Sequence, residues 1–183
     1  ARSNTAGNAY GVGLTVAYDA LSIGAFVGEV ENKNPSNNST VRDEGHYAWN
    51  AKYSAGPVSI GYGQFQYESG LANTAEAIVT TAAKTLGTSS GIFDGDMFSI
   101  AFNVNDNLSV SYSEMDADHD PQTNVANTTG DLAGVSEKHE SLQVAYSMGA
   151  MSIKAYNTEI TNPGFDEDAA TLNVNEIALG LSF

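Results

Sequence analysis

Ile177-Ala-Leu179-Gly-Leu181-Ser-Phe183 closes the chain, and its alternation decides the fold class. Successive side chains of a β-strand point to opposite faces, so the isoleucine, both leucines and the phenylalanine share one face. The alanine, glycine and serine share the other face. This segment is therefore predicted to be a strand with one apolar face and one face of small residues.

The same period-2 alternation recurs in about nine segments along the chain. In the first of them, Tyr10, Val12, Leu14, Val16 and Tyr18 alternate with glycine, threonine and alanine. Segments of roughly 9 to 13 residues are close to the length that a tilted membrane-spanning strand needs. The phase is unclear at Gln64 to Tyr67, which predicts a β-bulge there. The remaining segments begin near residues 21, 46, 58, 98, 108, 142, 151 and 177.

Connections between these segments alternate between short and long. Long polar connections are expected near residues 32–43, 70–95, 118–137 and 162–170, and Ala75–Leu86 has the apolar spacing of a short helix. Tight turns at one end and long loops at the other are typical of transmembrane barrels with periplasmic turns and extracellular loops. The short connections are predicted at Asp19-Ala20, Ala55-Gly56-Pro57, Asn105-Asp106-Asn107 and Gly149-Ala150.

Composition excludes several classes of protein. The formal charge of -15, from 22 acidic and 7 basic residues, argues against nucleic-acid binding, which needs basic side chains to neutralise phosphates. The absence of cysteine excludes thiol chemistry and disulfides. No run approaches the roughly 18 apolar residues of a spanning helix, but alternating barrel strands give only a weak hydropathy signal.

The two predicted strand faces suggest different roles. Aromatic residues with a polar tip suit the two bilayer interfaces; the candidates are Tyr10, Tyr18, Tyr47, Trp49, Tyr53 and Phe183. A lysine facing lipid at mid-membrane costs about 2 to 4 kcal/mol, so the lysines are expected on the opposite, wet face. The candidate pore-lining residues are Asn50, Lys52, Ser109, Ser111, Gln143, Ser152 and Lys154.

The acidic run Asp116-Ala-Asp118-His-Asp120 is a candidate Ca²⁺ site, because Ca²⁺ takes 6 to 8 oxygen ligands. It lacks the glycine and the final glutamate of an EF-hand, and a solvated acidic loop is the alternative interpretation. A further interpretation is that divalent cations bridge such acids to lipopolysaccharide phosphates. The three histidines, at positions 46, 119 and 139, belong to no recognisable catalytic motif, so we expect no enzyme and no required cofactor.

The terminal strand ending in Phe183, the small residues of the second face, the acidic loops and the hairpin rhythm resemble a known family. They are similar to the C-terminal portion of general-diffusion porins of Gram-negative bacteria, of the Rhodobacter-like alphaproteobacterial type. The resemblance implies an antiparallel up-and-down barrel of sixteen strands in the outer membrane. It also implies a homotrimer that contacts lipid and lipopolysaccharide and passes small hydrophilic solutes and ions. The family's constriction loop belongs to an earlier hairpin, which this sequence does not contain.

Strand direction gives an expectation about the missing part. The last strand follows a long loop, so Phe183 is expected at the periplasmic end, and counting back places Ala1 outside. Bacterial barrels have an even number of strands with both ends periplasmic. Residues 1–183 are therefore predicted to be a single barrel domain that is N-terminally incomplete.

Three other functions stay open at this point. A substrate-specific channel needs an aromatic or basic track along the lumen, and the alternation reveals no continuous one. A non-channel barrel, acting as an adhesin or structural protein, would fill a narrower lumen with large side chains. A soluble β-sandwich would turn its apolar faces inward.

Overall fold

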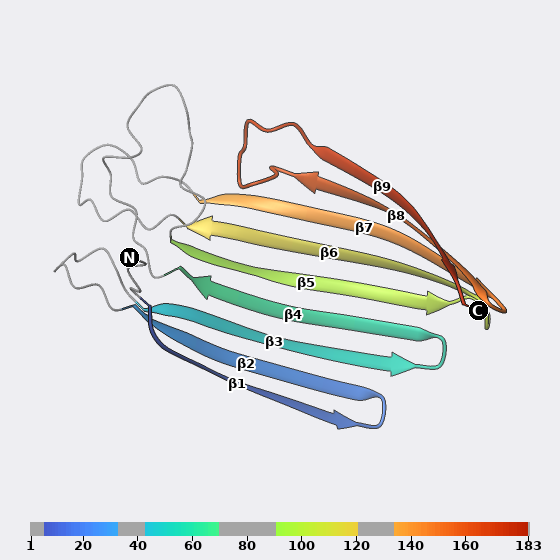
Figure 1. The fold of residues 1–183 in the computed structure, drawn as a ribbon, viewed down its shortest axis with the longest axis horizontal. Coiled ribbons are helices and arrows are strands. Elements are labelled where there is room, and N and C mark those ends of the chain that lie inside the picture. Colours follow the sequence, from blue (N-terminus) through green and yellow to red (C-terminus); the bar gives the residue numbers. More distant parts are fainter. Residues whose placement is uncertain (1–5, 33–42, 70–90, 121–133, 183) are drawn as a thin grey trace.

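The computed structural model describes residues 6–32, 43–69, 91–120 and 134–182. Within these ranges nine strands form a single antiparallel sheet in which every strand pairs with its neighbours in sequence (Figure 1). The prediction of about nine strands in an all-β meander is confirmed. The strands are β1 (Ala6–Tyr18), β2 (Leu21–Asn32), β3 (Glu44–Ala55), β4 (Val58–Glu68), β5 (Ile92–Asn103), β6 (Leu108–Asp120), β7 (Val135–Met148), β8 (Met151–Thr161) and β9 (Leu172–Leu181).

Four short turns lie together at one end of the sheet, called here the turn end (Figure 1). Asp19, Gly56 and Gly149 have φ angles of 51°, 56° and 58° in three of these turns. Left-handed backbone is what two-residue hairpin turns need, and aspartate and glycine adopt it readily. In the fourth turn, Asn105 Oδ1 accepts the backbone amides of Asn107 (2.9 Å) and Leu108 (3.0 Å). All four predicted short connections are present.

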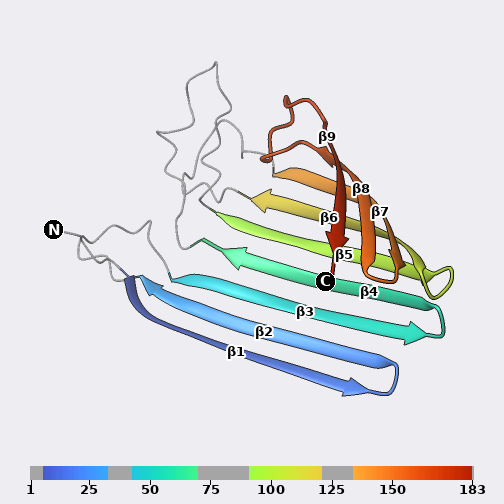
Figure 2. The same cartoon turned by 45° about the vertical axis from the view of Figure 1, so that its right-hand side comes forward.

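The opposite end of the sheet is called the loop end. Among the described connections, only the one from β8 to β9 lies there, over residues 162–171. The sheet is strongly curved, and β9 comes forward of the middle strands when the molecule is turned (Figure 2). β1 and β9 are the two edges of the sheet, which is not closed in the described part of the chain.

The predicted bulge at Gln64 to Tyr67 is wrong. β4 stays in continuous register with β3 and with β5 through these residues. Gln64 and Gln66 point to one face, and Phe65 and Tyr67 point to the other. The alternation is therefore regular here, and the sequence pattern is unclear only because the polarity of each face changes along β4. The register shift of this sheet lies instead between Ala6 and Ala9, where β1 pairs with β2.

The sheet has almost no hydrophobic core of its own. Among the described residues, the buried apolar side chains are Ala117 and Val135. By contrast, 29 large hydrophobic side chains in the same described ranges are exposed. A single layer of strands that leaves its apolar residues uncovered needs another apolar medium or surface against it.

The described ranges contain no helix of the length and hydrophobicity needed to cross a membrane. The helix predicted for Ala75–Leu86 lies outside the described residues, and so does Phe183.

Candidate functional site

The register places the seven candidate pore-lining residues on one face of the sheet. Ser22 pairs with Lys52 and Gly24 with Asn50, and Ser111 pairs with Gln143 while Lys154 pairs with Ala178. Directly paired residues point to the same face, so the pairs across the sheet put all seven candidates on one face. They are Asn50, Lys52, Ser109, Ser111, Gln143, Ser152 and Lys154. Alternation along single strands was therefore enough to group them.

This face is the concave one. A hollow of about 580 Å³ extends over β3 to β7, and the side chains that line it from this face are mostly small or polar. A second hollow, of about 420 Å³, lies over β6 to β9 and contains Lys154 beside Tyr156 and Glu176. Tyr156 Oη donates a hydrogen bond of 2.7 Å to Glu176 Oε2. The polar side chains lining the larger hollow include Asn50, Lys52, Ser59, Ser99, Ser111, Ser113, Ser141 and Gln143.

Glycines on the concave face leave space next to the backbone, and polar side chains of neighbouring strands fill it. A Cβ on Gly61 would meet Ser99 Oγ at 2.7 Å, and one on Gly180 would meet Ser152 Oγ at 2.6 Å. Likewise, the side chain of Asn50 lies 3.0 Å from where a Cβ of Gly24 would stand. The backbone at these glycines is thus covered by hydroxyl and amide groups, which are hydrogen-bonding surfaces for water or polar solutes.

The other face is convex and apolar at the turn end. Of the 29 exposed large hydrophobic side chains, only Phe26, Met97, Leu172 and Val174 lie on concave-face positions of the described strands. On β1, the outward residues from Tyr10 to Tyr18 are 56% to 82% exposed. The predicted interfacial aromatics Tyr10, Tyr18, Tyr47, Trp49 and Tyr53 are all exposed on this face.

Trp49 and its neighbours show how the apolar band ends. Trp49 Nε1 donates to Gln64 Oε1 at 3.1 Å, and Gln64 Nε2 donates to Tyr62 Oη at 3.1 Å. The Trp49 and Tyr62 rings meet edge-on at 5.6 Å. The two rings therefore pack against each other while the polar atom of each bonds to the side-chain amide of Gln64. From Gln64 toward the loop end, the convex face of β4 is polar.

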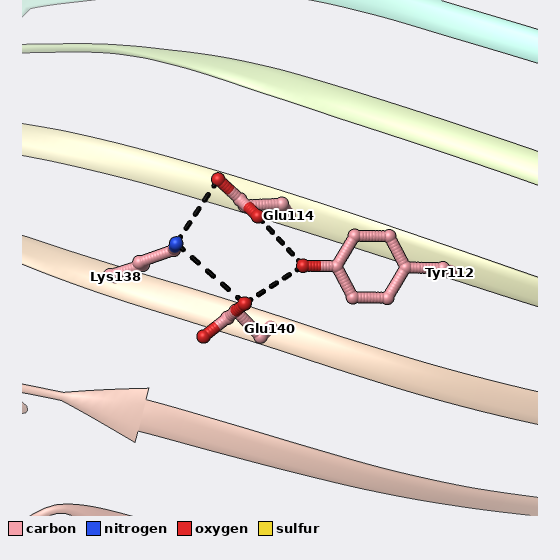
Figure 3. Close-up of polar contacts among 4 residues, drawn as sticks. All are labelled: Tyr112, Glu114, Lys138 and Glu140. Atoms are coloured by element: carbon pink, nitrogen blue, oxygen red, sulfur yellow. Dashed lines mark hydrogen bonds and ion pairs between the residues drawn. The ribbon is translucent and has the colours of Figure 1, made fainter.

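A charged network continues this boundary onto β6 and β7 (Figure 3). Tyr112 Oη shares one hydrogen between Glu114 Oε2 (2.7 Å) and Glu140 Oε1 (2.8 Å). Lys138 Nζ lies 3.2 Å from Glu114 and 3.6 Å from Glu140. One cation and one hydroxyl thus hold two carboxylates that would otherwise repel each other across the strand pair.

The polarity of both faces reverses toward the loop end of β4 to β6. On the convex face, the apolar residues of β5 give way to Asp94 and Asp96. On the concave face, serine and glycine give way to Phe65, Tyr67 and Phe93. The concave face is therefore small and polar near the turns but aromatic near the loops.

Rings from four neighbouring strands form a row across the concave face at the loop end, called here the aromatic row. His46 lies 4.8 Å from Tyr67, Tyr67 lies 6.0 Å from Phe93, and Phe93 stacks on His119 at 4.1 Å with an interplanar angle of 2°. Each of these contacts joins directly paired residues. His119 is fully buried. The sequence alone did not predict the row, although Tyr67 and Phe93 flank the same long connection.

The predicted acidic site does not lie in a loop. Asp116, Asp118 and Asp120 all belong to β6 and point to its convex face, where Asp116 pairs with Lys138. The Ser136 hydroxyl donates to Asp118 Oδ1. Within the described ranges, no group of three or more histidine, aspartate or glutamate side chains is arranged to hold a metal ion. Ca²⁺ binding there stays a prediction.

The third histidine is paired with a carboxylate. His139 Nε2 lies 2.6 Å from Glu137 Oε1 on the concave face of β7. The other oxygen of Glu137 accepts the backbone amide of Gly164. Glu137 therefore ties the loop between β8 and β9 to the wall, which no sequence pattern indicated.

Comparisons with known proteins add no assignment: no protein family, no curated protein and no solved structure matches this chain.

Proposed function

We propose that this sheet is part of the wall of a transmembrane β-barrel, and that the barrel is a water-filled channel for small hydrophilic solutes and ions. The observation that carries the proposal is the inverted sidedness of the sheet. Large apolar side chains cover the exposed convex face, whereas serine, glycine, asparagine and lysine occupy the concave face next to the turns. A soluble protein buries the first set and exposes the second.

The height of the apolar band supports a membrane location. Tyr10 and Tyr18 stand eight residues apart on β1, a rise of about 27 Å along the strand. A tilt of about 35 to 45° reduces this to roughly 20 Å, before the lengths of the side chains are added. Outer-membrane barrels present an apolar band about 25 Å tall between two aromatic girdles. Tyrosines at both ends of the band on β1 match that arrangement.

The concave face supports diffusion through a wet lumen. Its turn-end half carries hydroxyl and amide groups and the ammonium groups of Lys52 and Lys154, so a solute meets hydrogen-bonding partners without an enclosed binding pocket. Passage down a gradient needs no catalytic group and no cofactor. In this proposal the protein resides in a bacterial outer membrane, contacts lipid and lipopolysaccharide, and assembles as a homotrimer.

Two measurements test the proposal. The purified chain should stay monodisperse only in detergent, because none of the described segments covers the convex face; monodispersity without detergent contradicts the membrane location. Reconstituted in planar bilayers, the closed barrel that contains this sheet should give ohmic current steps, grouped in threes if the trimer forms. A membrane-inserted protein without current steps would favour the non-channel barrel.

The aromatic row favours a second candidate, a substrate-specific channel. Its partly exposed rings, those of Tyr67 and Phe93, lie at one height on the wall and can stack on a sugar or another flat solute as it enters. The row crosses the strands instead of running along them, so it offers one contact level and no continuous track. Saturable block of the ion current by an oligosaccharide, lost in Tyr67→Ala, would favour this candidate. A current unaffected by the sugar would exclude it for that solute.

A further inference from the structure

The loop between β8 and β9, residues 162–171, folds over the concave face. Phe165 lies 5.4 Å from the ring of Phe93 on β5 and 5.4 Å from that of His119 on β6. β7 separates β8 from β6 in the sheet, so the loop crosses β7 to make these contacts. Since Phe93 and His119 belong to the aromatic row, the loop is held against the wall at the loop end.

Several bonds fix the loop in this position. The Gly164 amide donates to Glu137 Oε2, and Asn162 Nδ2 donates to the Ser136 carbonyl at 2.9 Å. Asn162, Gly164 and Phe165 have φ angles of 52°, 74° and 56°. Asparagine and glycine adopt left-handed backbone readily, but a bulky residue such as Phe165 keeps it only where surrounding contacts hold it. The ring contacts and the two hydrogen bonds to β7 supply that restraint.

The fixed loop carries negative charge. Asp166, Glu167 and Asp168 follow Phe165 directly, and all three side chains are exposed. Asp166 Oδ1 accepts the amide of Asp168 at 3.0 Å, and its carbonyl accepts the amide of Ala169 at 3.1 Å. This tight turn keeps the carboxylates near Phe165, and therefore near the concave face.

We propose that the loop of residues 162–171 narrows the loop-end mouth of the channel and makes it prefer cations over anions. The inference rests on the proposed channel function and adds the element that sets its selectivity. Three charges about one Debye length from the ion path, in water and at 0.1 M salt, raise the local concentration of a monovalent cation about two- to fivefold. At 1 M salt the screening length falls to about 3 Å, and the preference should nearly vanish.

The test compares two triple variants in planar bilayers under a KCl gradient. Asp166→Asn/Glu167→Gln/Asp168→Asn removes three charges from the loop and keeps side chains of the same size. Glu68→Gln/Asp94→Asn/Asp96→Asn removes three charges from the convex face of β4 and β5 and serves as the matched control. We expect the K⁺-to-Cl⁻ permeability ratio at 0.1 M salt to fall about two- to fivefold in the first variant and to stay unchanged in the second.

Phe165→Ala tests the position of the loop separately from its charge. Without the ring contacts, the loop should leave the wall, the conductance should rise, and the Gly164 amide should exchange hydrogen faster with solvent. Equal permeability ratios in the unmodified protein and the loop triple variant would overturn the inference, as would an unchanged conductance in Phe165→Ala. Absence of any channel in the unmodified protein would instead contradict the proposed function, and hydrogen exchange at Gly164 would still report whether the loop is held.

Discussion

Replacing Leu14 by lysine is the sharpest test of which face of the sheet meets lipid. Leu14 is 67% exposed and stands midway between Tyr10 and Tyr18 on β1, four residues from each. That spacing is a rise of about 13 Å along the strand to either tyrosine. With a strand tilt of about 40°, the side chain lies roughly 10 Å inside each interface. Lysine at such a depth should destabilise the folded state by about 2 to 4 kcal/mol.

Two variants control for depth and for face. Tyr18→Lys puts the same charge at the edge of the band, where the cost should fall to about 0 to 1 kcal/mol. Thr15→Lys moves the charge one residue along β1, onto the concave face opposite Gly24, where the side chain of residue 15 is exposed. That variant should fold with nearly unchanged stability.

The assay is reversible guanidinium unfolding of the protein in lipid vesicles, followed by tryptophan fluorescence. A soluble sheet predicts the opposite order, because lysine on an exposed face is tolerated and lysine on a covered one is not. If Leu14→Lys proved as stable as the unmodified protein while Thr15→Lys was destabilised by 2 kcal/mol or more, the lipid-facing assignment of the convex face would be wrong.

Further changes test the hydrogen bonds, the packing and the wall charges. Tyr112→Phe removes the hydroxyl that joins Glu114 and Glu140, and should cost about 1 to 2 kcal/mol of unfolding free energy; Tyr146→Phe, on the same face, is the control and should cost almost nothing. Gly95→Ala would push a Cβ into the Asp116 carbonyl oxygen and to 2.9 Å from the Ala117 Cα, so a loss of about 1 to 3 kcal/mol is expected. Gly13→Ala, whose Cβ finds its nearest atom at 3.6 Å, should be nearly neutral, and equal effects of the two alanines on guanidinium unfolding would refute the packing argument. Lys154→Gln should lower the chloride share of the current at low salt, measured by reversal potential, whereas an unchanged share would remove this lysine from the ion path.

The sequence predicted the strands well because the apolar alternation is local. Leu142, Val144, Tyr146 and Met148 specify both a strand and its face without reference to any other segment. Aspartate and glycine at positions 19, 56 and 149 likewise mark turns through their own backbone preferences.

Contacts between distant residues were not predictable in the same way. Tyr67 and Phe93 meet only because β4 and β5 pair in one register, which the alternation within each strand does not determine. Phe165 reaches β5 through a loop whose path depends on Glu137 and on three left-handed residues. The change of polarity at Gln64 resembled an irregular strand. The sequence of one strand does not show that the neighbouring strands change polarity at the same height.

The uneven height of the apolar band has a consequence for the surrounding lipid. The band covers five outward residues on β1, from Tyr10 to Tyr18, but only three on β6, from Leu108 to Tyr112. Along the strands these distances are about 27 Å and 13 Å. In a membrane, such a wall would be hydrophobically matched on one side and too short on the other, so the bilayer beside β6 would have to thin. This thinning costs a fraction of a kcal/mol per Å of mismatch. The cost would be avoided where another protein with an equally short apolar band packs against β6.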